Sequence, residues 1–184
     1  MSDYSIKGSK FLSYILRHHP EEYNCSIDEC GWVSIKDICD NTRFSMEDIM
    51  TIIKNDTRYE LSSDYTKIRA YHGHSVEGVF AVNKEKPSGV LYHGTSLDAL
   101  NGIAEDGYIK SMSRNYVHIS ESYDDALRVG SRHGEPVVIE IDVEMMSKEG
   151  FEFYKSGDGV WLTKVVPTRY IKNKCIFINK SFDW

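Results

Sequence analysis

The chain has 184 residues, of which 41% are hydrophobic and 27% charged; this is ordinary for a soluble globular protein and allows one domain or two small lobes. Its formal net charge of −6 excludes a general positive coat and argues against broad nucleic-acid affinity. No apolar run approaches the roughly 20 residues that span a bilayer, and the N-terminus lacks the charged and apolar regions of a signal peptide, so a cytoplasmic protein without membrane contact is expected.

The first part of the chain has the pattern of helices followed by a hairpin. Apolar residues recur at one-face spacing through residues 4–18, which predicts a helix that Pro20 ends. The further expected elements are a strand at 31–33, a helix that Ser34 caps, a helix that Ser45 caps with Asp48 as a weaker capping box, and a hairpin of 59–61 with 65–70. This order predicts a winged-helix-like lobe over residues 1–82.

The pattern changes after a polar stretch with proline and glycine at residues 83–89, which is expected to be a linker. Beyond it, short strands are expected at 90–92, 116–119, 137–141, 151–154, 160–162 and 175–178, with helices near 96–105 and 122–129. Residues 90–184 are therefore predicted to form a second lobe of α+β class with a strand-rich core.

Arginines and histidines stand in short islands at glycine-punctuated corners. The islands are Arg17-His18, Arg69 with Gly73-His74-Ser75, His93-Gly94-Thr95 and Arg132-His133-Gly134. In an acidic chain this distribution favours one pocket for an anionic ligand. Each island alone also has a plain structural interpretation, because cations suit a helix C-terminus and polar loops are usually solvated.

Metal binding is a weaker alternative. His72 and His74, two residues apart, have a spacing that metal ligands can use. The cysteines are Cys25, Cys30, Cys39 and Cys175. Their spacing matches no common zinc pattern, and in a reducing compartment they are expected to be free thiols. The sequence therefore predicts no metal site.

Six short blocks follow one another along nearly the whole chain. They are Ser9-Lys10-Phe11-Leu12-Ser13 with Leu16-Arg17-His18, Ile68-Arg69-Ala70 with Gly73-His74-Ser75, Leu91-Tyr92-His93-Gly94-Thr95, Val117-His118-Ile119-Ser120, Arg132-His133-Gly134-Glu135-Pro136-Val137-Val138, and Gly159-Val160-Trp161-Leu162-Thr163. In this order the blocks resemble the RNA 2′-phosphotransferase family (KptA-like, tRNA 2′-phosphotransferase). The chain departs from the family pattern at His72, where glutamine is usual, and at Tyr116, where histidine is usual.

The resemblance implies a fold and a reaction. The fold is an N-terminal winged-helix lobe followed by a C-terminal ADP-ribosyltransferase-like lobe. The reaction removes an internal 2′-phosphate from RNA with NAD⁺ as a consumed co-substrate. The phosphate first attacks the nicotinamide ribose and expels nicotinamide. The ribose 2″-hydroxyl then attacks phosphorus, which releases 2′-hydroxyl RNA and ADP-ribose 1″,2″-cyclic phosphate.

The resemblance also assigns residues. The family's catalytic tetrad falls on Arg17, His18, Arg69 and Arg132. Arginines orient a phosphate dianion bidentately, and His18 is the tetrad member able to donate a proton near neutral pH. The NAD-binding positions are His93, Gly94, Thr95, His118, Ser120 and Val160. Additional RNA or phosphate contacts are expected from Ser9, Lys10 and His74.

The expected partner is RNA with an internal 2′-phosphate, such as a tRNA-like substrate of tRNA processing and splicing, and the protein is expected to be a monomer. One alternative is an ADP-ribosyltransferase that stops after the first step and caps terminal phosphates of RNA or DNA. A second is a winged-helix regulator that binds nucleic acid, although such a regulator needs a basic recognition face.

Overall fold

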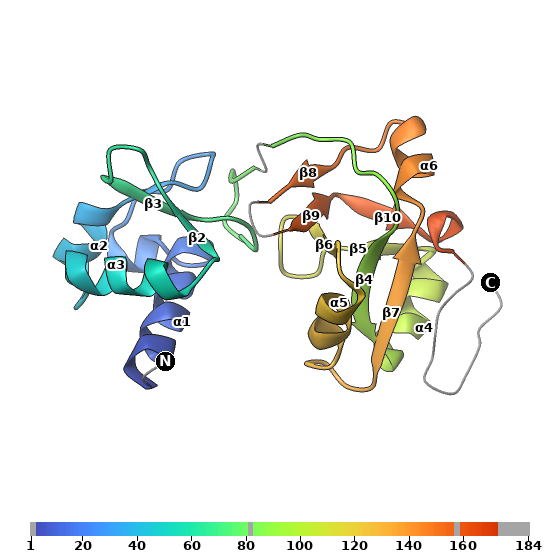
Figure 1. The fold of residues 1–184 in the computed structure, drawn as a ribbon, viewed down its shortest axis with the longest axis horizontal. Coiled ribbons are helices and arrows are strands. Elements are labelled where there is room, and N and C mark those ends of the chain that lie inside the picture. Colours follow the sequence, from blue (N-terminus) through green and yellow to red (C-terminus); the bar gives the residue numbers. More distant parts are fainter. Residues whose placement is uncertain (1–2, 81–82, 157–158, 173–184) are drawn as a thin grey trace. The chain divides into compact units, whose positions relative to one another are not determined.

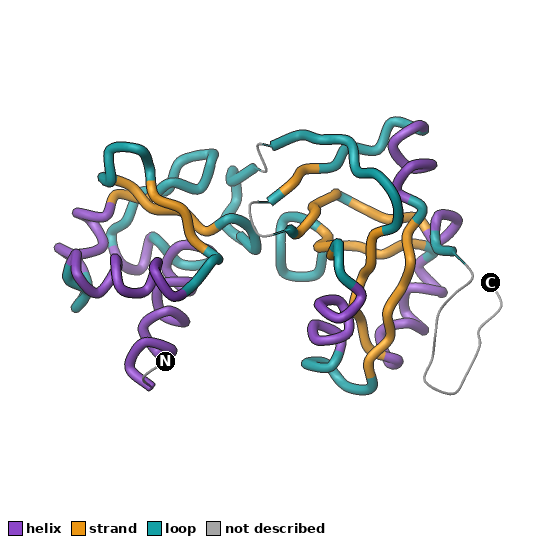
Figure 2. The backbone as a smooth tube through the Cα atoms, viewed as in Figure 1, coloured by secondary structure: helices purple, strands orange, loops and turns teal. Residues whose placement is uncertain are grey.

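The chain divides into two units, and each combines helices with antiparallel strands (Figures 1 and 2). The computed structural model describes residues 3–80, 83–156 and 159–172. Unit 1 comprises residues 1–82 with 113–115, and unit 2 comprises residues 83–112 with 116–184. Residues 83–85, inside the expected linker, form backbone hydrogen bonds with 153–155 and so belong to unit 2.

Unit 1 contains helices and one small antiparallel sheet. Its elements are α1 (Asp3–Arg17), η1 (Glu21–Tyr23), β1 (Val33–Ser34), α2 (Ile35–Asn41), α3 (Met46–Asn55), β2 (Tyr59–Leu61) and β3 (Lys67–Ala70). The strand order is β1-β3-β2. The expected helices and the hairpin are present, but the strand expected at 31–33 begins only at Val33, because residues 28–32 form a tight turn.

Side-chain caps and a shared core fix the elements of unit 1. The Ser34 hydroxyl accepts from the backbone of Asp37 at the start of α2, and Ser45 with Asp48 forms a reciprocal capping box on α3. The fully buried residues of the core are Leu12, Ile15, Leu16, Val33, Ile38, Ile49 and Ile68. They come from all three α-helices and from β1 and β3, so burial of apolar surface holds the last turn of α1 against the sheet.

A polar network fixes α1 to the segment that precedes β2. The Ser9 hydroxyl hydrogen-bonds to the Asp56 carboxylate and to Arg58, and Arg58 pairs with Asp56. The Tyr59 hydroxyl donates to the Ser9 carbonyl at 2.6 Å. Burial opposes ionisation of Asp56, but hydrogen bonds from Arg58 and Ser9 outweigh it and lower the pKa of this carboxyl to about 2.

Asp56→Asn is expected to destabilise the protein by about 2 kcal/mol at neutral pH. Because the pKa of Asp56 is lower in the folded protein than its ordinary value of 3.8, the ionised carboxylate stabilises the fold above that value. The contribution is lost as the pH falls through about 2. Urea unfolding at neutral and acidic pH measures the effect, and a variant that keeps the acid sensitivity of the wild type would contradict it.

Unit 2 is built on a five-stranded antiparallel sheet. Its elements are β4 (Leu91–Ser96), α4 (Leu97–Asp106), β5 (Tyr108–Lys110), β6 (Val117–Ser120), α5 (Tyr123–Gly130), β7 (Pro136–Ile141), α6 (Val143–Lys148), β8 (Tyr154–Lys155), β9 (Val160–Thr163), β10 (Val165–Pro167) and η2 (Thr168–Tyr170). The main sheet has the order β7-β4-β6-β9-β8, and β10 pairs with β5 in a second sheet. Figure 1 shows β4 and β7 side by side, with α5 against β4.

Helices α4 and α5 cover opposite faces of the main sheet. Leu100 of α4 lies in the apolar cluster with Leu91 and Ile139, whereas Ala126 of α5 contacts the other face at Gly94. The central cluster also contains the buried residues Val117, Ile119, Val137, Ile141, Phe153, Trp161 and Tyr170. Within the described residues, no helix is both long and apolar enough to cross a membrane.

Several elements of unit 2 differ from the sequence expectation. β4 continues through Ser96 because it pairs with β7 along six residues, so the helix begins after a longer strand than expected. The strand expected at 151–154 begins only at Tyr154, and Phe151 and Phe153 precede it as packed loop residues. β5, α6 and β10 were not predicted. The strand expected at 175–178, with Cys175, lies outside the described residues.

Candidate active site

Arg17 and His18 lie where α1 ends and the segment 71–76 crosses it. The Arg17 side chain is buried, with 8% of its surface exposed. The Ser75 amide donates to the Arg17 carbonyl at 2.9 Å. Gly73 has φ +91°, and a Cβ there would lie 3.4 Å from Nη1 of Arg17. The glycine therefore supplies both a left-handed backbone turn and close approach to the guanidinium.

His18 is held by the same segment. Its Nδ1 lies 2.9 Å from the Ser75 hydroxyl oxygen. A hydroxyl can donate to the neutral ring or accept from the protonated ring, so this bond orients His18 in both states. Partial burial lowers the pKa of His18, and the positive charges of Arg17 and Arg114 lower it further. A histidine with such a pKa is a stronger acid than a free one.

Arg69 on β3 is held from several sides. Its Nε donates to Oε2 of Glu60 at 2.8 Å, and its Nη2 is 2.6 Å from the same oxygen. Nη1 donates to the Cys30 carbonyl at 3.4 Å. The guanidinium carbon lies 4.5 Å from the centre of the Trp32 ring, and only 15% of the side chain is exposed. The guanidinium is thus fixed before any ligand arrives.

His74 is a neutral group among these cations. Burial lowers its pKa to about 4, and the charges of Arg17, His72, His18 and Arg69 add to the effect. Its Nε2 is buried and lies 3.0 Å from the position that a Cβ on Gly31 would occupy. His74 therefore stays uncharged at neutral pH and contributes a dipole rather than a charge.

Arg114 was not predicted from the sequence. Asn115 joins residues 113–115 to unit 1: its amide donates to the His74 carbonyl at 2.9 Å, and its side chain donates to the carbonyls of Val76 and Val79. This attachment brings Arg114 close enough to lower the pKa of His18. No local sequence pattern signals it, because the contact joins residues about forty positions apart.

Arg114→Ala is expected to raise the pKa of His18. Removing a neighbouring positive charge makes the protonated imidazole less unfavourable, so protonation persists to higher pH. An NMR titration of the His18 ring measures the shift. Arg43→Ala, at an exposed arginine of the same unit, is the matched control and is expected to leave the titration unchanged. An unchanged His18 titration in the Arg114 variant would contradict the assigned proximity.

The remaining predicted anion-binding residues lie elsewhere. Arg132 is an exposed residue of unit 2 in the turn after α5, where its amide donates to the Val129 carbonyl. Lys10 is exposed on α1, and Ser9 is buried with its hydroxyl bound to Asp56 and Arg58. Unit 1 thus brings together Arg17, His18, Arg69 and His74 from the predicted set.

In unit 2, two predicted histidines are linked by a chain of hydrogen bonds between ring nitrogens and backbone carbonyls. Nδ1 of His93 is 2.9 Å from the His118 carbonyl, and Nδ1 of His118 is 3.1 Å from the Tyr116 carbonyl. A carbonyl only accepts, so each ring carries its proton on Nδ1 and presents Nε2 as an acceptor when neutral. Burial lowers the pKa of His93, although the bond to His118 opposes this effect, and His93 is neutral at physiological pH.

The strands that carry these residues separate along part of their length. β4 pairs with β7 at six positions, but with β6 it registers only at Tyr92–Ser120. Ser120 in turn pairs with Val160 of β9. Thr95 is buried beyond the separation, and the edge of β4 that faces β6 has no registered pair from His93 to Ser96 within the described strands.

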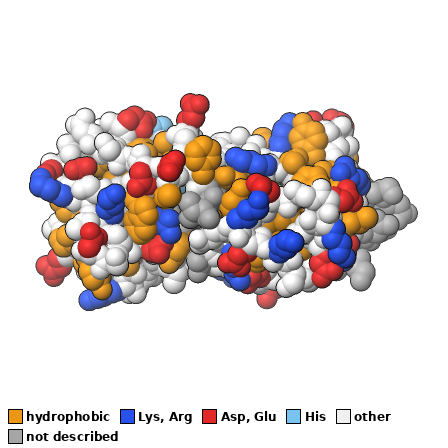
Figure 3. Space-filling model, turned by 90° about the horizontal axis from the view of Figure 1, so that it is seen from above, with side chains coloured by type: hydrophobic (Ala, Val, Ile, Leu, Met, Phe, Trp, Pro, Cys, Tyr) orange, Lys and Arg blue, Asp and Glu red, His pale blue; other side chains and the backbone are white. Residues whose placement is uncertain are grey.

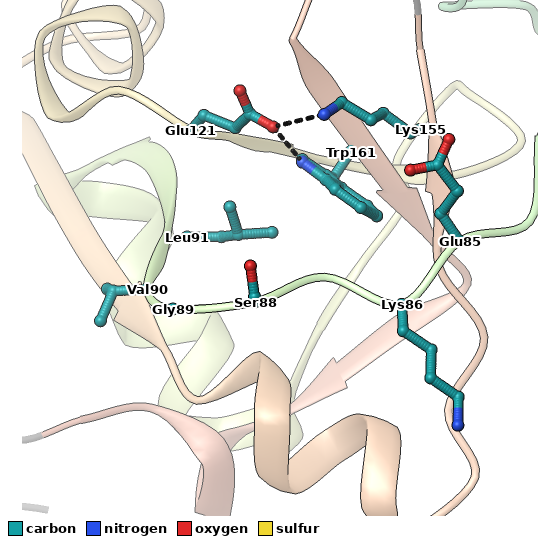
Figure 4. Close-up of a pocket in the computed structure, with 9 residues that line it drawn as sticks. All are labelled: Glu85, Lys86, Ser88, Gly89, Val90, Leu91, Glu121, Lys155 and Trp161. Atoms are coloured by element: carbon teal, nitrogen blue, oxygen red, sulfur yellow. Dashed lines mark hydrogen bonds and ion pairs between the residues drawn. The ribbon is translucent and has the colours of Figure 1, made fainter.

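A pocket of about 520 Å³ opens on another part of unit 2 (Figure 4). The Glu121 carboxylate in its wall accepts from the Trp161 indole at 2.8 Å and pairs with Lys155 at 3.2 Å. Glu121 and Trp161 follow Ser120 and Val160 directly, so they face the opposite side of the sheet. None of the predicted NAD-binding residues lines this pocket, and two of its charged residues, Glu121 and Lys155, pair with each other.

The described residues include no group of three or more histidine, cysteine, aspartate or glutamate side chains placed to hold a metal ion. Cys25, Cys30 and Cys39 are free thiols. Burial raises the pKa of Cys25 to about 11, so this thiol is protonated at neutral pH and is a poor nucleophile.

Known proteins resemble this chain over nearly its full length. A sequence model described as "RNA 2′-phosphotransferase, Tpt1 / KptA family" matches residues 3–165. A protein of Fusobacterium nucleatum is 40% identical, covering 92% of this chain and 99% of its own. One from Acaryochloris marina is 41% identical, covering 91% and 97%, and one from Pectobacterium atrosepticum is 39% identical, covering 94% and 99%. All three are named "Probable RNA 2′-phosphotransferase". The chain belongs to the RNA 2′-phosphotransferase (Tpt1 / KptA) family.

Proposed function

We propose that the protein removes an internal 2′-phosphate from RNA in an NAD-dependent reaction. The observation that supports this most directly is the gathering of Arg17, His18 and Arg69 in unit 1 of an otherwise acidic chain. Family membership supports the same substrate class. The physiological RNA in this proposal is tRNA-like, and the reaction belongs to tRNA processing.

The cations of unit 1 suit a phosphate monoester. A dianion needs several oriented donors, and guanidinium groups supply N–H pairs in a planar fork. Glu60 and the Cys30 carbonyl occupy three of the five N–H groups of Arg69, which leaves one on Nη1 and one on Nη2 with no hydrogen bond within the described residues. Arg17 is buried beside the segment 71–76, and its attraction for an anion is therefore screened less than at an exposed site.

The proposed reaction has two steps. A 2′-phosphate oxygen bonds to the anomeric carbon of the nicotinamide ribose as the glycosidic bond to nicotinamide breaks. The ribose 2″-hydroxyl then bonds to phosphorus and loses its proton to water, while the bond from phosphorus to the RNA 2′-oxygen breaks. His18 gives its proton to that oxygen, while Arg17, Arg69 and Arg132 stabilise the negative charge that grows on the phosphoryl oxygens.

The proposed NAD⁺ residues fit a ligand with an amide and a ribose. Residues 93–96 of β4 pair with β7 on one side and have no registered pair with β6 on the other, and in this proposal NAD⁺ binds along that second side. Neutral His93 offers an acceptor nitrogen for a ribose hydroxyl, and the His118 carbonyl holds its ring in place. In this assignment His93, Gly94 and Thr95 hold the nicotinamide side. Val160 supplies no carboxylate that could act as a base. The proposed reaction needs none at this position, because the attacking phosphate is already an anion. Ser120 completes the set beside Val160.

The same proposal assigns an architecture to each unit. The helices and three-stranded sheet of unit 1 are consistent with a winged-helix lobe, and the separated antiparallel strands of unit 2 with an ADP-ribosyltransferase-like lobe. The scheme uses no metal and assumes a cytoplasmic monomer.

Binding to RNA without the 2′-phosphate is expected to be weak and to fall with salt. Acidic and basic side chains are interspersed over the face in Figure 3, which offers no broad one-signed surface to a phosphate backbone. Titration of plain and 2′-phosphorylated versions of one oligonucleotide at two salt concentrations measures this. Equal affinity for the two RNAs would overturn the assigned specificity.

The decisive test incubates the protein with NAD⁺ and a short RNA that carries one internal 2′-phosphate, and reads the products by mass spectrometry. Wild type is expected to yield 2′-hydroxyl RNA, nicotinamide and ADP-ribose cyclic phosphate, and Arg132→Ala to yield none of the cyclic phosphate. An RNA that gains ADP-ribose and keeps it would instead identify a phosphate-capping ADP-ribosyltransferase. An unchanged RNA would refute the proposal.

A further inference from the structure

A tight turn at residues 28–32 packs against Arg69. The Asp28 carboxylate accepts from the amides of Cys30 and Trp32 at 3.0 and 2.9 Å, and the Gly31 amide donates to the Asp28 carbonyl at 2.9 Å. The Asp28 amide donates to the Trp32 carbonyl across the base of the turn. These bonds fix the backbone on both sides of Gly31, which has φ +81°.

Three residues of the turn, Cys30, Gly31 and Trp32, lie against Arg69 and His74 of the candidate anion site. The Cys30 carbonyl accepts from Arg69, the missing side chain of Gly31 leaves room for His74, and the Trp32 ring covers one face of the Arg69 guanidinium at 4.5 Å. The Glu60 carboxylate forms an ion pair with the edge of the same guanidinium. Arg69 is therefore restrained in its plane by hydrogen bonds and out of its plane by an aromatic ring.

We propose that Trp32 is a positioning residue for phosphate recognition by Arg69. Its indole face holds the guanidinium so that the two N–H groups left by Glu60 and Cys30 stay available to an oxyanion. The inference rests on the proposed function, because it takes a phosphate as the ligand of Arg69.

The energetic reason is preorganisation. A free arginine side chain loses rotamer freedom when it orders around a ligand, and that loss weakens binding. An arginine already stacked on an aromatic ring loses less. Ordering one such side chain on binding costs about 0.5 to 1.5 kcal/mol, so an arginine that is ordered in advance gains up to about tenfold in affinity.

The test compares Trp32→Leu with Trp32→Phe. The measurements are the affinity for a 2′-phosphorylated RNA oligonucleotide without NAD⁺, and kcat and KM in the full reaction. Trp32→Leu is expected to weaken RNA binding by about tenfold, while the KM for NAD⁺ stays unchanged. Trp32→Phe, which keeps an aromatic face, is expected to recover most of the loss. Phe44→Leu, a matched loss of a half-buried aromatic ring in unit 1, is expected to leave RNA affinity unchanged.

A double-mutant cycle separates positioning from a structural role. If Trp32 acts through Arg69, then Trp32→Leu combined with Arg69→Met binds no more weakly than Arg69→Met alone. Additive losses, failure of Trp32→Phe to recover binding, or an equal loss in Phe44→Leu would each overturn the proposal. Melting temperatures identify any variant whose folding has changed.

The outcomes also separate this inference from the function on which it rests. Turnover by wild type, with Trp32→Leu equal to wild type, refutes the positioning role and leaves the phosphotransferase intact. Selective binding of the 2′-phosphorylated RNA without turnover refutes the phosphotransferase, and the binding cycle still decides the role of Trp32. A wild type that binds both RNAs equally refutes the positioning role, and turnover of the 2′-phosphorylated RNA decides the phosphotransferase separately.

Discussion

His18→Ala is expected to convert the protein into one that accumulates RNA carrying ADP-ribose on its 2′-phosphate. Nicotinamide leaves without a proton donor in the first step, so that step continues. In the second step the RNA 2′-oxygen leaves as an alkoxide unless it receives a proton, and loss of a general acid slows such a step by about 10² to 10⁴-fold. Mass spectrometry of a single-turnover reaction measures the intermediate and the cyclic phosphate over time.

The neighbouring histidine supplies the matched control. His19 follows directly, but it stacks on Tyr14 and lies 3.3 to 3.4 Å from Glu22 and Glu21, and its charge is the smallest of the causes that lower the pKa of His18. His19→Ala is expected to leave both steps unchanged. An absence of intermediate in His18→Ala, with nicotinamide release also lost, would show that the residue is needed before the second step.

The pH dependence of the wild-type reaction is expected to reflect the protonation of His18. Burial and the charges of Arg17 and Arg114 hold the pKa of His18 below its ordinary value, so the protonated acid declines as the pH rises through that lowered pKa. The second step is therefore expected to slow with rising pH. In Arg114→Ala this decline moves to higher pH.

The local parts of unit 1 could be predicted because their causes are local. Ser34 and Ser45 cap helices through hydrogen bonds to residues three positions on, and a pattern of that length is legible in a sequence. The hairpin of β2 and β3 likewise joins residues close in the chain. The placement of Arg17 at the end of α1 followed from the helix boundary alone.

The groups that surround the predicted cations could not be predicted, because their contacts are distant in the chain. Arg69 reaches Cys30 across 39 positions and lies over Trp32, and no periodicity connects them. Arg114 belongs to a three-residue segment that Asn115 joins to unit 1. In unit 2, β5 is a strand because Tyr108–Lys110 pairs with Val165–Pro167, and three residues carry too little pattern to reveal that alone.

Gly94 shows how one sequence signal can have two causes. The family resemblance assigns the block His93-Gly94-Thr95 to NAD⁺ binding. In the fold, Gly94 also lies under α5: a Cβ would stand 1.8 Å from the Ala126 carbonyl oxygen and 2.6 Å from its carbon. Gly130 approaches the Thr95 carbonyl in the same interface. Helix packing alone therefore requires glycine at position 94.

Gly94→Ala is accordingly expected to destabilise unit 2 by at least about 3 kcal/mol without any ligand. The clash is with backbone atoms of α5, which cannot move aside as a flexible side chain can. Denaturant unfolding in the absence of NAD⁺ measures the loss. Gly102→Ala is the control, since that position in α4 is exposed with nothing within 4 Å of the new Cβ, and it is expected to stabilise by about 0.5 to 1 kcal/mol.

The comparison also decides what the glycine contributes to the cofactor. If Gly94→Ala lowers stability as expected and the fraction that remains folded binds NAD⁺ normally, the residue serves the contact between β4 and α5. If stability is unchanged and NAD⁺ binding is lost, the glycine serves the ligand and the 1.8 Å approach to Ala126 is relieved by a small shift of the helix. Loss of both stability and NAD⁺ binding would mean that the packing of α5 and the binding of the cofactor depend on the same backbone position. Residue 94 would then be constrained by the fold of unit 2 and by its proposed site together.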